Sequence, residues 1–499
     1  MNSNSIERND STPRPEDGGA VLRQTVEFLA ALAMCVVAAR TFAVEAYVVP
    51  TGSMAPTLLG VHREATCANC RFRFVVGVDD EGRSGRLVCP NCGQDRRDDD
   101  ATIECDGDRL LVQKFLYEFR SPRRWEVVVF QSPHEPSRSY VKRVVGLPGE
   151  SIQIVAGDIY INGSIARKTV SERRAARVLV YDNDYPPADA DKFPRWTPRR
   201  GAFRGPSRSG WTIAGTTLRR DPLGKIATQI AGSPMNRHMR LIDWLEYHHF
   251  APDRTAYGPI RDFYSYNGGD LTAENHVDDL MFEGEFAVEP GVDAVWIRLI
   301  GGGGKQTVRI PVDGRGAIEA TTDGRSRSVK HALNGVQSTP PGKPRWRKIE
   351  ASTFDREFTV LLDGEPLLDP IVDDTAPGFG KVSAGAPLSI GVEGTGRVVV
   401  RGVKLYRDLY YTPNLLQTPR RSIAVEKPYK LGRDEYFVLG DNSPISNDSR
   451  FWPKSPVIHG DDLIGKPFLV HLPSQAAPLK VFGRATYWIP DPTKIRYVR

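Results

Sequence analysis

Short apolar and β-branched segments, separated by turn residues, recur along most of this chain and constrain its fold more than any other feature. They include "WEVVVFQSP", "SIQIV", "DAVWIRLIG", "REFTVLLDG" and "RVVVRGVKLY". Runs of this kind bounded by Gly, Asp and Pro are typical of strands, and Asn162-Gly163 predicts a hairpin turn. The chain is therefore predicted to be mainly β, with antiparallel sheets. Its 499 residues exceed one ordinary core, which predicts two or three domains.

Two stretches are predicted to differ from this pattern. Residues 183–225 are rich in Pro, Arg and Gly and are predicted to form a surface linker. The segment "MRLIDWLEYHHF" is predicted to form a short helix. The net charge of +6, from 67 basic and 61 acidic side chains, is too weak a bias to indicate a nucleic-acid partner. Such a charge would suit a protein that lies near anionic lipid headgroups.

An apolar segment near the N-terminus reads "FLAALAMCVVAARTFAV" from Phe28 to Val44, with Arg40 as its one charge. Seventeen residues is the low end of what spans a bilayer. We predict an uncleaved transmembrane anchor over 26–46, after an N-terminal tail over 1–25. A cleaved signal peptide is the alternative, but cleavage here would leave the following Gly–Ser turn at a new N-terminus.

Two CxxC pairs follow, with 18 residues between them. They are Cys67-Ala-Asn-Cys70 and Cys89-Pro-Asn-Cys92. Four thiolates at this spacing are typical of a zinc ribbon that holds one structural ion. Two short disulfides are the alternative, which an oxidising compartment would favour.

The segment "YVVPTGSMAPTLLG", from Tyr47 to Gly60, places a Gly–Ser turn between two prolines. It exposes the hydroxyl of Ser53 on a rigid backbone, although an ordinary membrane-edge turn has the same composition. A serine becomes a good nucleophile only when a base takes its proton. None of the nine His lies in a motif-like setting, and Pro56 stands where a Ser-x-x-Lys motif would need lysine.

A lysine elsewhere in the chain is the remaining candidate for a base. Lys142 lies in the apolar, strand-like "YVKRVVGLPG", where burial would lower its pKa by disfavouring the charged form. Arg143 would face the opposite side of the same strand. Taken alone, this segment favours a surface lysine over a catalytic base.

Four segments read together resemble the ordered motifs of bacterial signal peptidase I. They are "PTGSMAPTL", "GDRLLVQKF", "YVKRVVGLPGE" and "GDNSPISNDSR", and the preceding anchor also matches. The resemblance covers roughly 47–66, 101–170 and 406–499. It departs from the usual pattern at Ser443–Ile445 and at Trp125-Glu126.

The resemblance implies a role for each matching residue. Ser53 would be the nucleophile and Lys142 the general base, while the Thr51 hydroxyl and the Ser53 backbone N–H would form the oxyanion hole. Ser446 would hydrogen-bond and orient the lysine, and Asp448 with Arg450 would support the site. No cofactor would be needed for catalysis; a structural zinc would be held by Cys67, Cys70, Cys89 and Cys92.

The same resemblance divides the chain. Catalytic parts over 47–66, 93–175 and 406–499 would be interrupted by a zinc-ribbon-like insert over 67–92 and by an insertion over 176–405. Residues 282–405 of that insertion resemble a lectin-like, jelly-roll β-sandwich. A carbohydrate ligand for the sandwich is one alternative, and an inert or protein-binding insertion is the other.

The expected function is a membrane-bound serine endopeptidase that removes signal peptides from exported preproteins. Its partners would be those preproteins and membrane lipid, with no nucleic acid. It would sit in the bacterial cell membrane with one span and its catalytic domain on the extracytoplasmic side. The alternative is a non-catalytic, membrane-anchored binding protein on a peptidase-like scaffold with a lectin-like head.

Overall fold

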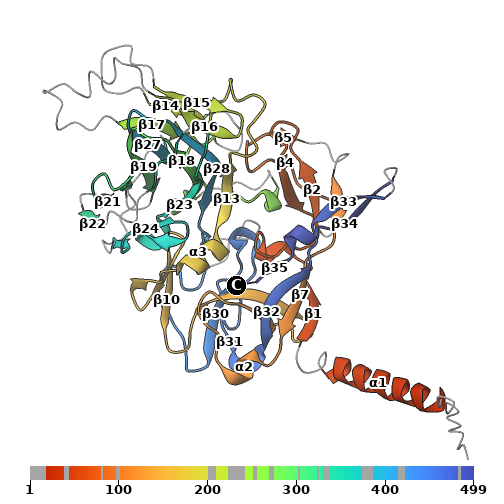
Figure 1. Ribbon diagram of the computed structural model, residues 1–499. Helices are drawn as coiled ribbons and strands as arrows, with labels where there is room; N and C mark the ends of the chain where they lie inside the picture. Colours follow the sequence, from red (N-terminus) through yellow and green to blue (C-terminus); the bar gives the residue numbers. More distant parts are fainter. Residues whose placement is uncertain are drawn as a thin grey trace, which may run out of the picture.

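The computed structural model describes the following residues: 18–38, 44–79, 83–96, 102–199, 209–222, 242–250, 256–268, 275–301, 304–322, 325–329, 336–340, 342–373, 386–413, 422–481 and 485–498. Its architecture is mainly β, with several antiparallel sheets, as the sequence predicts. Figure 1 shows a sandwich at the upper left, a large sheet of orange and blue strands at the bottom and a smaller lobe at the upper right.

The large sheet joins strands from both ends of the chain. Its strands, in spatial order, are β1 (Val44–Val48), β7 (Arg109–Gln113), β32 (Leu463–Leu472), β8 (Val127–Gln131), β9 (Ser139–Gly146), β30 (Glu435–Leu439) and β31 (Ile458–His459), and β35 (Arg496–Tyr497) pairs with β32. The central strands are apolar: residues 127–130 of β8 are all buried. The β8–β9 pairing places Lys142 opposite Val128, in the middle of the sheet.

A smaller sheet and two short helices complete this end of the molecule. The sheet contains β12 (Ser164–Ile165), β11 (Asp158–Ile161), β10 (Ser151–Val155) and β29 (Tyr429–Lys430). The helices are α2 (Leu116–Phe119) and α3 (Val170–Ala176). Helix α3 begins with a capping box, because the Thr169 hydroxyl accepts from the Glu172 backbone N–H and the Glu172 carboxylate accepts from the Thr169 backbone N–H.

The cysteine lobe is built from two small sheets. They are β3 (Arg73–Gly77), β2 (His62–Thr66) and β6 (Ile103–Cys105) in one, and β4 (Leu87–Val88) and β5 (Asp95–Arg96) in the other. The four cysteines of the CxxC pairs pack together with Phe74 and Val76 in a small core. A separate hairpin of β33 (Ala476–Val481) and β34 (Ala485–Pro490) precedes the C-terminus.

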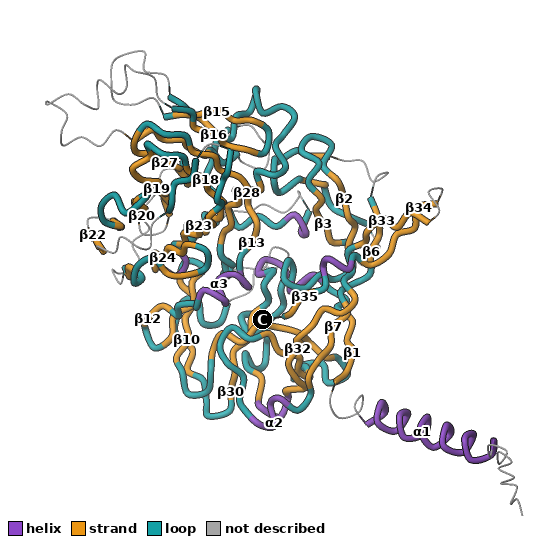
Figure 2. Tube along the Cα trace, in the orientation of Figure 1, coloured by secondary structure: helices purple, strands orange, loops and turns teal. Residues whose placement is uncertain are grey.

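Two facing sheets form the sandwich and enclose the largest hydrophobic core. One contains β15 (Trp211–Ala214), β16 (Thr217–Arg220), β28 (Val398–Arg407), β18 (Leu280–Val288), β23 (Arg347–Ser352), β24 (Glu357–Leu362) and β25 (Glu365–Pro366), with β13 (Val178–Asp182) beside β28 and β26 (Ile371–Val372) beside β24. The other contains β14 (Trp196–Pro198), β17 (Ile242–Tyr247), β27 (Leu388–Gly394), β19 (Val292–Gly301), β20 (Gly304–Pro311), β21 (Ile318–Thr322) and β22 (Arg325–Val329). Figure 2 shows how little helix this part contains.

The two exceptions predicted from the sequence are wrong for the residues that the structure describes. Within 183–225, the described residues 183–199 and 209–222 supply β14, β15 and β16 rather than a linker. Within the predicted helix, Ile242–Tyr247 forms β17, and residues 239–241 lie outside the described residues. These segments form strands because their aromatic residues Trp196, Trp211 and Tyr247 are buried in the sandwich core. The sandwich therefore draws strands from β13 onward, well before residue 282. Short 3-10 helices lie at Gly52–Met54 (η2), Ser265–Asn267 (η4), Phe354–Arg356 (η5), Ser443–Ile445 (η6), Gly460–Asp462 (η7) and Pro492–Lys494 (η8).

Helix α1 (Gly18–Ala38) projects from the body of the molecule (Figure 1). The span predicted over 26–46 is not confirmed in its extent, because the helix ends at Ala38 and Val44–Val48 already belongs to strand β1. Within the described residues, no helix combines the length and apolarity that a membrane crossing requires.

Candidate active site

Ser53 lies in the 3-10 turn η2, a few residues after strand β1. The turn is held by the loop that follows β30: the Asn442 backbone N–H donates to the Ser53 carbonyl at 3.1 Å, and Asn442 Nδ2 donates to the Gly52 carbonyl at 3.0 Å. The backbone of Ser53 is therefore fixed from a segment almost 400 residues away, while its side chain is half-buried.

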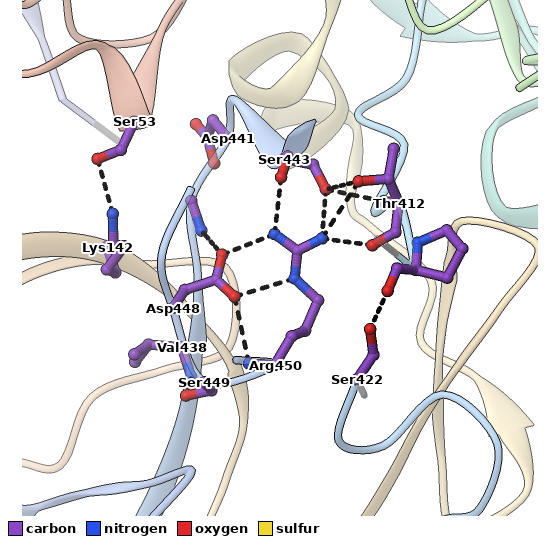
Figure 3. A network of polar contacts seen from close by, with 12 residues as sticks. Ser53, Lys142, Thr412, Ser422, Val438, Asp441, Ser443, Asp448, Ser449 and Arg450 are labelled. Atoms are coloured by element: carbon purple, nitrogen blue, oxygen red, sulfur yellow. Dashed lines mark hydrogen bonds and ion pairs between the residues drawn. The ribbon is translucent and has the colours of Figure 1, made fainter. Parts of the chain in front are cut away.

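Lys142 approaches Ser53 from the centre of the large sheet. Its Nζ lies 2.6 Å from Ser53 Oγ, a short hydrogen-bond distance, and the two side chains point toward each other in Figure 3. The lysine is 4 % exposed. Burial lowers the pKa of Lys142 to about 8, because a charged ammonium loses its hydration there; the nearby Asp448 raises it and Arg450 lowers it.

Two buried ion pairs lie close to this contact. Arg143, the neighbour of Lys142 on β9, points to the opposite side and donates Nε and Nη2 to the two carboxylate oxygens of Asp441, at 2.8 and 2.6 Å. Asp441 also accepts from the Thr57 hydroxyl at 2.5 Å, which ties it to the segment after Ser53. Both charged groups are buried, so each satisfies the other where water cannot.

The second pair is Asp448–Arg450. Arg450 Nε and Nη2 donate to the Asp448 carboxylate at 2.9 and 2.8 Å. Figure 3 shows the guanidinium between Asp448 on one side and Ser443 and Thr412 on the other; it donates to the Ser443 hydroxyl at 2.7 Å and to the Thr412 carbonyl at 2.5 Å. This network fixes the loop that carries Asn442.

The other two predicted residues, Thr51 and Ser446, make no hydrogen bond to Ser53 or Lys142 among the described contacts. Thr51 directly precedes η2 in an extended conformation and is exposed. Ser446 is fully buried, but its Oγ has no hydrogen-bond partner among the described residues, so the expected bond to Lys142 is not present. Its hydroxyl packs against Gly440 instead: a Cβ on Gly440 would lie 2.1 Å from Ser446 Oγ.

The four cysteines of the CxxC pairs come together away from Ser53. Their sulfur atoms lie within 4.8 Å of one another, with Cys67–Cys92 at 3.5 Å and Cys70–Cys89 at 3.6 Å. These distances far exceed a disulfide bond of about 2.05 Å. Tetrahedral ligands at about 2.3 Å from a zinc ion would be about 3.8 Å apart. The cluster can therefore hold one such ion, and its thiols are free.

Chemically, the Ser53–Lys142 pair can activate a hydroxyl. A neutral amine within hydrogen-bond distance of a serine can take its proton, which is the requirement for nucleophilic catalysis. The four-cysteine cluster cannot add a Lewis acid to this step, since four thiolates leave no open position on a tetrahedral ion.

One protein family matches two regions of the chain that hold part of this site. The family described as "Signal peptidase, peptidase S26" matches residues 98–200 and 390–472, which include Lys142 and the Asp441–Arg450 loop but not Ser53. Proteins named "Signal peptidase I" match from Leptolyngbya laminosa, with 43% identity over 69 residues, and from Pseudomonas aeruginosa, with 40% over 80 residues. This chain resembles bacterial signal peptidase I.

The similarity to signal peptidase I is local. The Leptolyngbya match covers 12% of this chain and 34% of that protein, the Pseudomonas match 13% and 28%, and the match to "Signal peptidase I V" of Bacillus subtilis 12% and 33%. The chain thus spans about a third of the length of these relatives. The proteins that these matches name are peptidases.

Solved structures show a further, distant likeness. The carbohydrate-binding module CBM66 from Bacillus subtilis aligns with 42% of this chain and 94% of its own, at 10% identity and a TM-score of 0.22. The Caenorhabditis elegans galectin LEC-6 aligns with 30% of this chain and 87% of its own, at 12% identity and a TM-score of 0.18. At these scores the likeness carries no argument about ligands.

Sequence reasoning missed several residues that shape the site. Arg143 and Asp441 were not given a role, although a second cation directly after Lys142 on an apolar strand was a usable signal. The turn Tyr264–Asn267, which comes from the insertion and contacts η2, has no recognisable signal in the sequence. Its contacts arise from the tertiary packing of the insertion.

We predict that Arg143→Met destabilises the protein strongly, because it leaves the buried Asp441 carboxylate without its partner. Breaking a buried pair in this way costs about 3–5 kcal/mol of the free energy of unfolding. The matched control is Arg315→Met, since the Arg315–Asp293 pair is about half exposed and such pairs contribute at most about 1 kcal/mol. Denaturant unfolding of both variants measures the difference, and equal losses would contradict the prediction.

Proposed function

We propose that this chain is a serine endopeptidase of the signal peptidase I type, which cleaves N-terminal signal peptides from exported preproteins. The single observation that carries the proposal is the 2.6 Å contact between Lys142 Nζ and Ser53 Oγ, made by a lysine whose pKa burial lowers to about 8. The local similarity to proteins named "Signal peptidase I" supports the choice of substrate class.

In the proposed reaction, neutral Lys142 takes the proton of Ser53 as its oxygen attacks the scissile carbonyl. The tetrahedral intermediate places a negative charge on the carbonyl oxygen, and the Ser53 backbone N–H and the Thr51 hydroxyl would donate to it. Protonated Lys142 then gives its proton to the leaving amine, which leaves an acyl-enzyme on Ser53. A water molecule, deprotonated by Lys142, releases the acyl group and restores the serine.

The ion pairs support this proposal electrostatically. Burial lowers the pKa of Lys142 most, while Asp448 raises it and Arg450 lowers it, so the effects of the pair oppose each other and the pKa stays at about 8. Ser446 is proposed to act through packing against Gly440, whose chain segment leads to Asn442. A cofactor has no part in this scheme.

A structural zinc ion is proposed for the cysteine lobe. Beyond the four sulfur atoms, Asn69 Nδ2 lies 3.7 Å from Cys92 Sγ, a donor of the kind that stabilises a thiolate. Each CxxC turn is followed by a residue with positive φ, Arg71 at 64° and Gly93 at 75°, which closes the turn around its two sulfurs. The ion would supply folding free energy to a lobe with a small core.

We expect Ser53→Ala and Lys142→Met each to abolish cleavage of a preprotein by the purified enzyme, because one removes the nucleophile and the other its base. Lys454→Met, at an exposed lysine, is the control and should keep full activity. Gel analysis of the processed product measures the effect. An active Lys142→Met protein would exclude the proposed pair, and an inactive wild-type protein would favour a non-catalytic binding role.

The pH dependence should follow Lys142. Since the base works only when neutral, kcat/KM should rise with pH and level off above a pKa of about 8. An exposed lysine would put this limb near ~10.4. Initial rates between pH 6 and pH 11 on one preprotein locate the limb, and a midpoint at the ordinary lysine value would show that Lys142 is solvated or is not the base.

For the cysteine lobe, we predict about one zinc per chain, as expected for a four-thiolate site. The double variant Cys67→Ser with Cys89→Ser should lose the metal and melt at a lower temperature, because the lobe loses the binding free energy that folds it. Cys105→Ser, at a buried cysteine outside the four, is the control and should retain the ion. Metal analysis with intact-mass measurement decides, and two disulfides without metal would overturn the prediction.

A further inference from the structure

A turn from the insertion lies directly against the nucleophile turn. The segment is η4, Ser265–Asn267, and it contacts η2 and the cysteine lobe through Tyr266. The Tyr266 ring occupies the space beside Gly52 and Gly77, where an added Cβ would come within 1.9 and 2.4 Å of it. Its hydroxyl donates to the Val61 carbonyl at 2.8 Å. The insertion therefore packs directly against the turn that carries Ser53.

Asn267, the last residue of this turn, makes a reciprocal amide pair with Asn442. Asn267 Nδ2 donates to Asn442 Oδ1 at 2.8 Å, and Asn442 Nδ2 donates to Asn267 Oδ1 at 2.7 Å. The second hydrogen of Asn442 Nδ2 goes to the Gly52 carbonyl at 3.0 Å. Because a carbonyl can only accept, this contact fixes which end of the Asn442 amide faces Gly52, and the pairing then fixes Asn267.

The Gly52 carbonyl and the Ser53 N–H belong to one planar peptide unit. A hydrogen bond that holds the Gly52 oxygen therefore also sets the direction of the Ser53 N–H, which the proposed function uses as an oxyanion donor. The Gly52 carbonyl also accepts from the Ala55 backbone N–H at 3.0 Å. Without Asn267, Asn442 could turn about its side-chain torsions, and the Gly52 carbonyl would keep only that second hydrogen bond, which constrains the orientation of the peptide plane less.

We propose that Asn267 is a positioning residue for catalysis: through Asn442 it orients the Gly52–Ser53 peptide unit and so aims the Ser53 N–H at the reacting carbonyl oxygen. The inference rests on the proposed function and extends it, because it makes the insertion part of the catalytic apparatus rather than an appended head. Asn267 itself touches neither Ser53 Oγ nor Lys142 in the described contacts.

The insertion can hold Asn267 in place because its turn is anchored on both sides. Tyr264 donates its hydroxyl to the Asp441 carbonyl at 2.9 Å, next to Asn442. The Arg407 guanidinium lies 4.4 Å from the centre of the Tyr264 ring and donates to the Phe263 carbonyl at 2.9 Å. Arg407 ends strand β28 of the sandwich, so the sandwich carries the turn on a rigid element.

The kinetic test compares Asn267→Leu, which has a similar size and no hydrogen-bonding groups, with the wild type. We expect kcat for preprotein cleavage to fall roughly ten- to a hundredfold with KM changed less than threefold, since a misplaced donor weakens the transition state more than substrate binding. The pH limb near 8 should not move, because Lys142 is untouched. Asn267→Asp keeps the acceptor for Asn442 and the shape, and should lose less.

Two comparisons separate positioning from general support. Ser265→Ala lies in the same turn without a contact to Asn442 among the described hydrogen bonds, and should keep the wild-type kcat. In a double-variant cycle, Asn442→Ala combined with Asn267→Leu should lose no more than Asn442→Ala alone, because Asn267 acts through Asn442. Additive losses, a shifted pH limb or an unchanged kcat in Asn267→Leu would each overturn the inference.

A readout independent of cleavage distinguishes failure of this inference from failure of the proposed function. In protein labelled with ¹⁵N-serine, the Ser53 amide resonance should shift in Asn267→Leu and stay in place in Ser265→Ala. If the wild type does not cleave preproteins, the proposed function fails, yet this shift still tests whether Asn267 orients the peptide. An unmoved Ser53 amide overturns the positioning role whatever the activity.

Discussion

The Lys142 amine at the Ser53 contact is buried, and no carboxylate hydrogen-bonds to it among the described residues. Its pKa is therefore lowered by burial. The contrast with Lys168 makes this clear. Both lysines are buried, but Lys168 Nζ meets the carboxylates of Asp355 and Asp408, each at 2.7 Å, and its pKa is raised, because those charges outweigh the burial that lowers it. Lys142 faces a neutral hydroxyl, so burial dominates and its pKa is lowered. One amine serves as a structural cation and the other is suited to be a base.

Two carboxylates lie near Lys142, and each is paired with an arginine rather than with the lysine. Asp441 and Asp448 each bind an arginine, Arg143 and Arg450. Both carboxylates still raise the pKa of Lys142, but Arg450 opposes them, and burial has the larger effect. The Arg143–Asp441 pair ties strand β9 to the loop after β30, and the Asp448–Arg450 pair lies within that loop. The electrostatic setting of the lysine and the rigidity of the loop that holds the Ser53 backbone are thus produced by the same side chains.

The insertion and the cysteine lobe are joined to this site by specific contacts. Lys168 links the segment before α3 to Asp355 and Asp408 on the sandwich side, and its Nζ also lies 4.4 Å from the Trp125 ring centre. Asn69, between Cys67 and Cys70, donates to the Asp189 carboxylate at 2.8 Å. With Tyr266 seated between Gly52 and Gly77, the three parts form a continuous support around the nucleophile turn. The residues around the nucleophile turn, the cysteine lobe and the insertion are therefore joined by direct contacts.

The sequence by itself determined the mainly β class, because β-branched runs between turn residues are local signals, and it predicted Ser53, Lys142 and the four cysteines, because each lies in a short recognisable motif. It failed where the deciding contacts are distant in the chain: β14 to β17 form where their aromatic residues meet the sandwich core, and Ser446 packs against Gly440 rather than bonding to Lys142. Only the tertiary structure decided the 2.6 Å approach of two residues 89 positions apart and the lowered pKa of Lys142. It also decided that Asn267 of the insertion pairs with Asn442. The physical reason is that burial and charge proximity depend on which segments surround a group, whereas strand preference and metal-ligand spacing are written in neighbouring residues.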